Sequence, residues 1–179
     1  QTGNIWIGKF VEKEDKKYIS SETFNELRCK EVEPGDILIC RLAEPTGRSC
    51  IVPELDTKMI TSVDCTIVKV DSNKFDNRFI NYYLNTERNL REIQKFEQGT
   101  TRKRITRSDL QLIKIPVPPL DEQKEIADIL NSVDYKLEIY ESRKQQLQQL
   151  KKGLMQKLLT GKIRVKVWLE ETGWQRTLI

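Results

Sequence analysis

Apolar and polar residues alternate most regularly between positions 121 and 160. Apolar side chains recur there at spacings of four and three residues, which is the periodicity of one face of an α-helix. The stripe comprises Ile126, Leu130, Val133, Leu137 and Tyr140 and resumes at Leu147, Leu150, Leu154 and Leu158. A proline-rich segment at 116–119 precedes it, Asp121 suits the N-cap, and Gly161 suits the residue after the helix. The pattern predicts one helix over residues 121–160, roughly 60 Å long.

Charge is distributed unevenly along this predicted helix. Acidic residues concentrate in its first half and basic residues in its second half. Two parallel copies would bring like charges together, whereas an antiparallel pair would place the acidic half of one helix against the basic half of the other. A helix of this length is also more typical of a coiled coil than of a compact domain. We therefore predict an antiparallel helix pair; a long helix that packs on its own domain stays open as the alternative.

Residues 1–120 contain short apolar runs and amphipathic segments, which predict an α+β domain. Strands are predicted at 5–7, 37–40, 49–52, 63–70 and 112–117, and helices at 18–27 and 76–96. The strands at 37–40 and 49–52 form a predicted hairpin, because proline and glycine turn residues lie between them. A further strand is predicted at 162–168. The chain is thus a mixed α/β domain at 1–120, a long coiled-coil-forming helix at 121–160, and a strand with a tail at 161–179.

The composition argues against several classes of protein. Of the 179 residues 32% are charged, and no run approaches the roughly 20 apolar residues that a membrane span needs. No signal-peptide pattern opens the chain and no CxxC pair occurs, so we expect a cytoplasmic protein with reduced cysteines. The chain lacks histidine, which excludes Ser-His-Asp and Cys-His catalysis. We see neither a Walker A loop nor a GxGxxG motif, and we expect no metal and no cofactor in this chain.

The densest positive charge lies between residues 88 and 107, where seven basic residues accompany only two acidic ones. Its centre consists of Thr100, Thr101, Arg102, Lys103 and Arg104, and Arg107 follows. Hydroxyl and ammonium groups suit phosphate contacts, and the arginine fork suits the guanine edge in the major groove. Arg41 and Arg48, at the open end of the predicted hairpin, complete the candidate set. These residues predict a DNA-binding surface; a basic loop that is merely solvated is the alternative.

Several motifs resemble those of type I restriction-modification specificity (S) subunits. They are Gly35-Asp36-Ile37-Leu38, Thr46-Gly47-Arg48, Gly99-Thr100-Thr101-x-Lys103, Ile115-Pro116-x-Pro118-Pro119-Leu120-x-Glu122-Gln123 and Lys152-Gly153-Leu154-x-Gln156-x-Leu158. The last two are together the most specific, and the match covers most of the chain. The resemblance implies a target-recognition domain followed by the helix typical of that family.

The resemblance further implies a subunit that binds double-stranded DNA and has no catalytic role. The domain at 1–120 would read one half of a bipartite target. The helix at 121–160 would dimerise, hold two recognition domains apart, and bind methyltransferase (M) subunits. S-adenosylmethionine would belong to the M subunits, and ATP and Mg to the catalytic partners, which include a restriction (R) subunit. No membrane partner is implied.

Family members carry two such units in tandem, whereas this chain carries one. It is either a half-size subunit that forms a homodimer through antiparallel helices or a fragment of a longer subunit. Residues 161–179 would pack back on a recognition domain and supply its missing opening strand. Two further hypotheses are a small enzyme with its own active site, which the composition disfavours, and a coiled-coil adaptor or DNA-binding regulator without a restriction-modification role.

Overall fold

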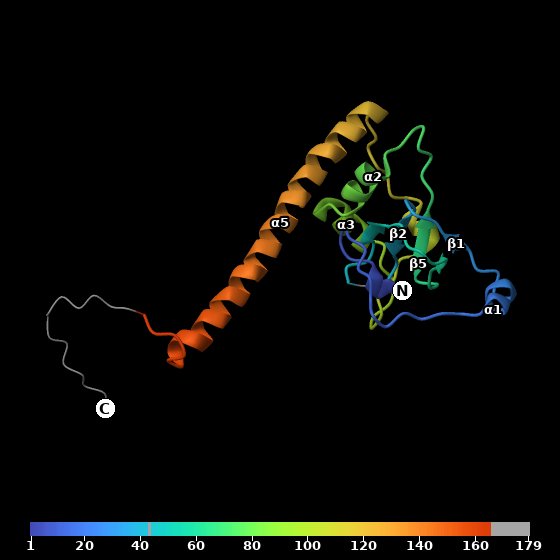
Figure 1. Cartoon of the computed structure of the whole chain (residues 1–179). Coiled ribbons are helices and arrows are strands. Elements are labelled where there is room, and N and C mark those ends of the chain that lie inside the picture. The colour runs from blue at the N-terminus through green and yellow to red at the C-terminus, as the bar shows by residue number, and fades with distance from the viewer. Residues whose placement is uncertain (43, 166–179) are drawn as a thin grey trace. The chain divides into compact units, whose positions relative to one another are not determined.

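Three short apolar runs build the central sheet in a computed structural model that describes residues 1–42 and 44–165. Strand β2 (Ile37–Cys40) pairs antiparallel with β3 (Ser49–Ile51) on one side and with β5 (Cys65–Val68) on the other (Figure 1). All four residues of β2 are buried, because the central strand is covered on both faces. The hairpin of β2 and β3 confirms the sequence prediction, and the predicted strand at 63–70 shortens to β5.

The two faces of the sheet carry separate apolar clusters, as expected when successive side chains of a strand point to opposite sides. On one face, Leu38 and Cys40 pack with Ile5 and Val32. On the other, Ile37 and Ile39 pack against helix α2 (Asn77–Leu84) through Phe79, Ile80 and Leu84. The core therefore lies on both sides of β2, and α+β is confirmed as the fold class.

The predicted helix at 76–96 is two helices, α2 and α3 (Glu87–Gln94). Asp76 caps α2 by accepting bonds from the N–H groups of Arg78 at 2.8 Å and Phe79 at 3.2 Å. Thr86 caps α3 by accepting from the N–H of Asn89 at 3.3 Å. The prediction of one continuous helix was wrong because the Thr86 hydroxyl accepts from the N–H three residues later and so starts a new helix.

The remaining elements of the first 119 residues are short. They are the 3₁₀ turn η1 (Thr2–Asn4), α1 (Ser21–Glu26), α4 (Arg107–Leu110), and the antiparallel pair β1 (Glu31–Val32) and β4 (Met59–Ile60). Ser20 caps α1 by accepting from the N–H of Thr23, and α1 is shorter than the helix predicted at 18–27. The predicted strand at 5–7 was wrong, because Ile5 forms only an isolated bridge with Phe10. The strand at 112–117 was also wrong, and its Pro116 has no N–H to donate to a ladder.

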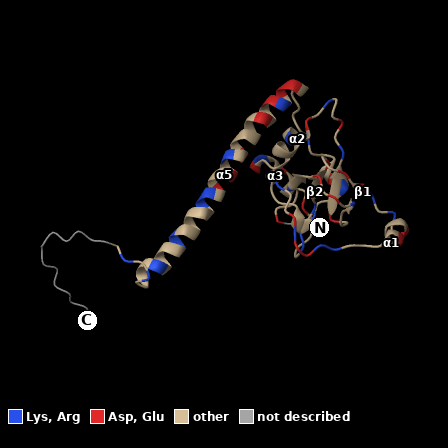
Figure 2. Cartoon of the chain, in the orientation of Figure 1, with Lys and Arg blue, Asp and Glu red and all other residues tan. Residues whose placement is uncertain are grey.

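Helix α5 (Leu120–Leu159) confirms the predicted long helix within one residue at each end. The chain divides into two compact units, residues 1–130 and 131–179, which we call the head unit and the helix unit. The head unit thus includes the start of α5 and extends beyond the predicted domain at 1–120. Figure 2 shows acidic residues at the start of α5 and basic residues along its later part.

The predicted apolar stripe of α5 divides between the two units. Ile126 packs with the head core around Ala127, so its prediction as a partner-helix residue does not match its surroundings. From Leu130 onward the stripe is exposed, from 38% at Leu130 to 70% at Tyr140. No helix within residues 1–42 and 44–165 is long and apolar enough to cross a membrane.

Part of the predicted C-terminal strand at 162–168 lies outside the described residues. Its described part, 162–165, forms no strand. The predicted tail, and the packing of 161–179 on a recognition domain, likewise fall largely outside the described residues.

Candidate nucleic-acid interface

A closed loop at residues 98–104, which we call the basic loop, carries the centre of the predicted site. Gln98 and Arg104 close it by reciprocal backbone bonds of 2.8 and 2.9 Å. Arg104 also forms an isolated bridge with Leu42, just beyond β2. The next residue, Ile105, is fully buried and donates its N–H to the carbonyl of Arg41 at 3.0 Å. The sheet therefore fixes the base of the loop, while residues 99–103 are exposed.

Gly99 is required for the backbone of this loop. Its φ is +99°, a conformation that side chains with a Cβ rarely adopt. A Cβ at this position would lie 2.7 Å from the carbonyl oxygen of Arg102. The loop thus turns tightly on itself, and its glycine serves the turn rather than contact with a ligand.

Two of the predicted DNA-binding cations form ion pairs that support the basic loop. Lys103 lies 3.5 Å from Glu97, whose side chain is only 9% exposed. Arg104 lies 2.6 Å from Asp64, which precedes β5. Both basic side chains are about half exposed, at 54% and 50%, so the pairs are weak and their cations remain accessible. Sequence reasoning missed Asp64, because a contact across 40 positions leaves no local pattern.

Arg102 and Arg107 are presented differently from these paired cations. Both are exposed, and within the described part of the chain neither side chain forms a hydrogen bond or an ion pair. Thr100 and Thr101 are exposed beside Arg102 on the same loop. Arginine and hydroxyl donors on a preformed loop suit contacts with phosphates and base edges. Arg88 on α3 is also exposed and has no hydrogen-bond or ion-pair partner among the described residues. In the sequence, only the density of basic residues between 88 and 107 pointed to this arginine.

The guanidinium of Arg41 faces the protein. It donates to the carbonyl of Ile105 at 3.4 Å and to the carbonyl of Val63. The backbone N–H of Arg41 donates to the carbonyl of Asp64 at 2.8 Å. Arg41 thus joins the end of β2, the segment before β5 and the base of the basic loop. It lies next to the candidate surface, but its contacts are structural.

Arg48 is turned inward even more completely. Its Nε donates to the carbonyl of Ile5 at 2.7 Å, and a terminal nitrogen donates to that of Thr2 at 3.1 Å. The other terminal nitrogen donates to the carbonyls of Leu42 and Pro45, both at 3.0 Å. Four of the five N–H donors that a guanidinium carries are therefore used within the protein. These contacts give Arg48 a structural role and do not favour its prediction as a DNA contact.

The residues just before Arg48 are also structural. Thr46 is fully buried, and Gly47 has φ +88°. A Cβ on Gly47 would lie 2.5 Å from Cδ1 of Ile93, so α3 packs directly on this turn. The Thr46-Gly47-Arg48 motif is thus explained by the packing of the hairpin turn.

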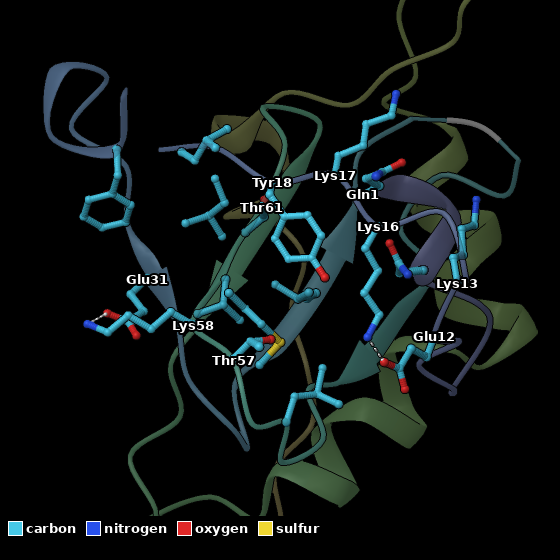
Figure 3. A pocket seen from close by; sticks show the side chains of 18 of the residues that line it. Gln1, Glu12, Lys13, Lys16, Lys17, Tyr18, Glu31, Thr57, Lys58 and Thr61 are labelled. Atoms are coloured by element: carbon cyan, nitrogen blue, oxygen red, sulfur yellow. Dashed lines mark hydrogen bonds and ion pairs between the residues drawn. The ribbon is translucent and has the colours of Figure 1, made fainter. Parts of the chain in front are cut away.

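A hollow of about 530 Å³ lies between the N-terminal segment and the β1–β4 pair (Figure 3). Lysines and Tyr18 surround it, but the ammonium of Lys16 pairs with Glu12 and that of Lys58 lies 3.4 Å from Glu31. The charge of these two lysines is therefore balanced by carboxylates, whereas Arg102 on the basic loop has no ion-pair partner among the described residues.

Two buried cysteines, Cys40 and Cys50, are unsuited to nucleophilic chemistry. Burial raises the pKa of the Cys50 thiol to about 12, and burial also raises the pKa of Cys40. Both thiols are therefore protonated at neutral pH, whereas a thiolate is the reactive form. Within residues 1–42 and 44–165, no group of three or more Cys, Asp or Glu side chains is arranged to hold a metal ion.

In the helix unit, the apolar stripe predicted to meet a partner helix is exposed. Exposure is 49% at Leu147, 57% at Leu150, 44% at Leu154 and 38% at Leu158. An exposed apolar strip of this length on a charged helix is typical of a protein–protein contact.

Comparison with known proteins places these features in a family. Residues 2–149 match the family model described as type I restriction modification DNA specificity domain. The type I restriction enzyme MjaVIII specificity subunit of Methanocaldococcus jannaschii is 44% identical over 166 residues, which are 91% of this chain and 39% of that protein. The type I restriction enzyme EcoKI specificity subunit of Escherichia coli K12 is 25% identical over 93% of this chain and 36% of that protein.

A solved structure supports the same relationship. One solved chain, described under complex assembly and conformational transition of the type I R-M system, has a similar fold, with a TM-score of 0.52 and 26% sequence identity to this chain. The similarity covers 72% of this chain and 31% of that chain. The present chain spans between 31% and 39% of the length of the curated relatives that it matches.

Proposed function

The chain belongs to the type I restriction modification DNA specificity domain family, and from this premise we propose that it supplies sequence specificity to a type I restriction-modification complex. The head unit reads one half of a bipartite target in double-stranded DNA. The observation that carries this proposal is the basic loop, whose base is fixed by the sheet and whose exposed residues present arginine and hydroxyl donors.

The candidate DNA contacts fall into two groups. Arg102, Thr100, Thr101 and Arg107 contact DNA directly, because they are exposed and have no competing partner among the described residues. Lys103 and Arg104 contribute positive charge and exchange their weak ion pairs for phosphate contacts. Arg41 and Arg48 hold the framework behind the loop.

The exposed stripe of α5 binds a second helix. Two identical chains pair antiparallel, because that arrangement places the acidic start of one helix near the basic end of the other. The complex also contains M subunits, which bring S-adenosylmethionine and transfer the methyl group, and an R subunit, which uses ATP and Mg. This chain contributes no catalytic group.

Methylation mapping tests the function directly. The chain is co-expressed with an M subunit of its restriction system, and methylated adenines are located across the host genome. We expect methylation at one interrupted motif, with two symmetric halves if two identical chains form the complex, because a two-fold protein requires a two-fold target. Methylation that is absent, or unrelated to any motif, would contradict the proposal.

Sizing by light scattering tests the helix pair separately. Wild type is expected at twice the mass of one chain, and Leu150→Asp at the mass of one chain, because a carboxylate in an apolar seam is costly. Gln145→Asp adds the same charge on the opposite side of the helix and should leave the dimer intact. A monomeric wild type would exclude the homodimer but not the DNA-reading role.

A further inference from the structure

Gln123 lies fully buried near the start of α5. Its side-chain oxygen accepts from the N–H of Asp76 at 3.0 Å. Its side-chain nitrogen donates to the carbonyls of Lys74 at 3.1 Å and Pro118 at 2.8 Å. One amide therefore joins α5 both to the segment before α2 and to the proline-rich lead-in. Neither glutamate nor methionine can replace these bonds, because glutamate lacks the two donors and methionine lacks every polar group.

A charged link reinforces this connection one and a half turns further along α5. Arg78 on α2 lies 2.8 Å from Asp76 and 2.5 Å from Asp128 on α5. Burial by itself would raise the pKa of Asp76, but hydrogen bonds from Arg78 and from the N–H of Phe79 outweigh it and hold the pKa below its ordinary value. Asp76 is therefore ionised at neutral pH and keeps both α2 and Arg78 in place.

Apolar contact completes the attachment. Ala127 is 0% exposed and shares a cluster with Phe79 and Ile80 of α2. Residues 120–130 are thus attached to the rest of the head unit by a buried amide, an ion pair and a core contact. The stripe residues that follow are exposed and belong to the helix unit.

We propose that Gln123 is a positioning residue for DNA recognition, because it holds the start of α5 on the head unit and so keeps two helix-linked heads at one spacing on DNA. This inference rests on the proposed function. Hydrogen bonds are directional, so the three bonds of Gln123 fix both the rotation of the first turn of α5 about its axis and its position along that axis. An apolar contact tolerates small shifts along the helix axis. A looser start of α5 would let the complex accept targets whose halves lie closer together or further apart.

The test measures the spacing that the complex accepts. The motif is first mapped for wild type co-expressed with its M subunit, and plasmids then carry the same two half-sites with the spacer lengthened or shortened by one base pair. Gln123→Met keeps the volume and removes the hydrogen bonds. We expect the preference for the native spacer over the altered ones to fall about tenfold, on the order of the loss of one hydrogen bond to a buried group. Gln145→Met, on the exposed part of α5, is the matched control and should retain the preference.

Asp128→Asn provides a second variant that leaves the core untouched, since the Asp128 side chain is 67% exposed. Asp128→Asn should also reduce the preference for the native spacer, by a smaller factor than Gln123→Met. If Gln123→Met fails to fold, the result for Asp128→Asn alone tests the inference. Amide hydrogen exchange of residues 120–126 is read in parallel and should rise in Gln123→Met. Unchanged spacer preference in both variants would overturn the inference, as would an equal loss of methylation at every spacer. A wild type that methylates no bipartite motif would instead refute the proposed function, a result distinct from either of these.

Discussion

Two turns of the head unit carry an arginine beside small residues, yet they use it in opposite ways. In the hairpin turn at 44–48, Arg48 donates four hydrogen bonds to carbonyls of the protein itself. In the basic loop at 98–104, Arg102 is exposed and has no such bond within the described residues. Both arginines look equally suited to DNA in the sequence. The difference shows that local composition identifies a donor but not where the donor points.

The two turns also differ in what their glycines accommodate. The positive φ of Gly47 brings the turn against Ile93 of α3, whereas the positive φ of Gly99 brings the loop against its own backbone at Arg102. The hairpin turn is therefore part of the core, and the basic loop is a small closed structure on its surface. Variants in the first should change stability, and variants in the second should change binding.

Replacing Arg48 should have the largest effect on stability. Arg48→Ala removes one donor from each of four carbonyls, of which those of Thr2 and Leu42 keep another. We expect the free energy of unfolding to fall by about 3 kcal/mol, since hydrogen bonds from a charged donor are worth about 1.5–3 kcal/mol each but are not additive. Urea denaturation followed by circular dichroism measures the change. Arg88→Ala, an exposed arginine on α3, is the matched control and should stay within about 0.5 kcal/mol of wild type. A loss in Arg48→Ala no larger than in the control would erase the distinction between the two turns.

Gly47→Ala should have the next largest effect, about 2 kcal/mol, because it combines a strained positive φ with a clash against Ile93. The double variant Gly47→Ala with Ile93→Val removes the Cδ1 atom that a new Cβ would meet at 2.5 Å. Its loss should therefore be smaller than the sum of the two single losses, as a double-mutant cycle in urea measures. Strict additivity would mean that the turn does not pack on α3 as described.

The sequence predicted the parts of this fold that rest on local patterns. The hairpin of β2 and β3 and the length of α5 followed from turn residues and helical periodicity, although α5 begins at Leu120, one residue before the Asp121 predicted as its N-cap. The break between α2 and α3 also had a local signal, a threonine at 86 followed by a glutamate, which the apolar periodicity of 76–96 masked. Local chemistry therefore predicted elements better than their ends.

The candidate site could be predicted only in part, because its distinctions depend on distant contacts. Arg48 donates to the carbonyls of Ile5 and Thr2, which precede it by 43 and 46 positions. Arg104 pairs with Asp64. No pattern around Arg48 or Arg102 encodes such partners. The same reason explains Ile126, which continues the stripe of Leu130 in sequence but packs with the core of the head unit.

Gly99→Ala should lower stability by about 1 kcal/mol, the approximate cost of a positive φ for a residue with a Cβ, while opening the basic loop. The new Cβ would lie 2.7 Å from the carbonyl of Arg102, so the bonds between Gln98 and Arg104 should lengthen or break. Amide exchange at these two residues should rise. Gly8→Ala is the matched control, because Gly8 also has a positive φ but nothing lies within 4 Å of its Cβ position. Protection of the loop amides equal in both variants would show that the loop does not depend on this close approach.

Arg102→Ala should leave stability unchanged and weaken DNA binding, which is the reverse of Arg48→Ala. Loss of one phosphate or base contact should lower affinity about fivefold, and loss of a phosphate contact should reduce the slope of log K against log salt by about one. The measurement is fluorescence anisotropy of labelled target DNA with the complex of chain and M subunit, over a series of salt concentrations. Arg102→Lys separates the two kinds of contact. If Arg102 meets a phosphate, lysine should restore both the salt slope and the affinity; if Arg102 meets guanine, lysine should not restore full affinity, because an ammonium cannot reproduce the bidentate arginine contact. Binding by Arg102→Ala that matches wild type at every salt concentration would remove Arg102 from the DNA surface, and the contrast between Arg48 and Arg102 would then reduce to one of stability alone.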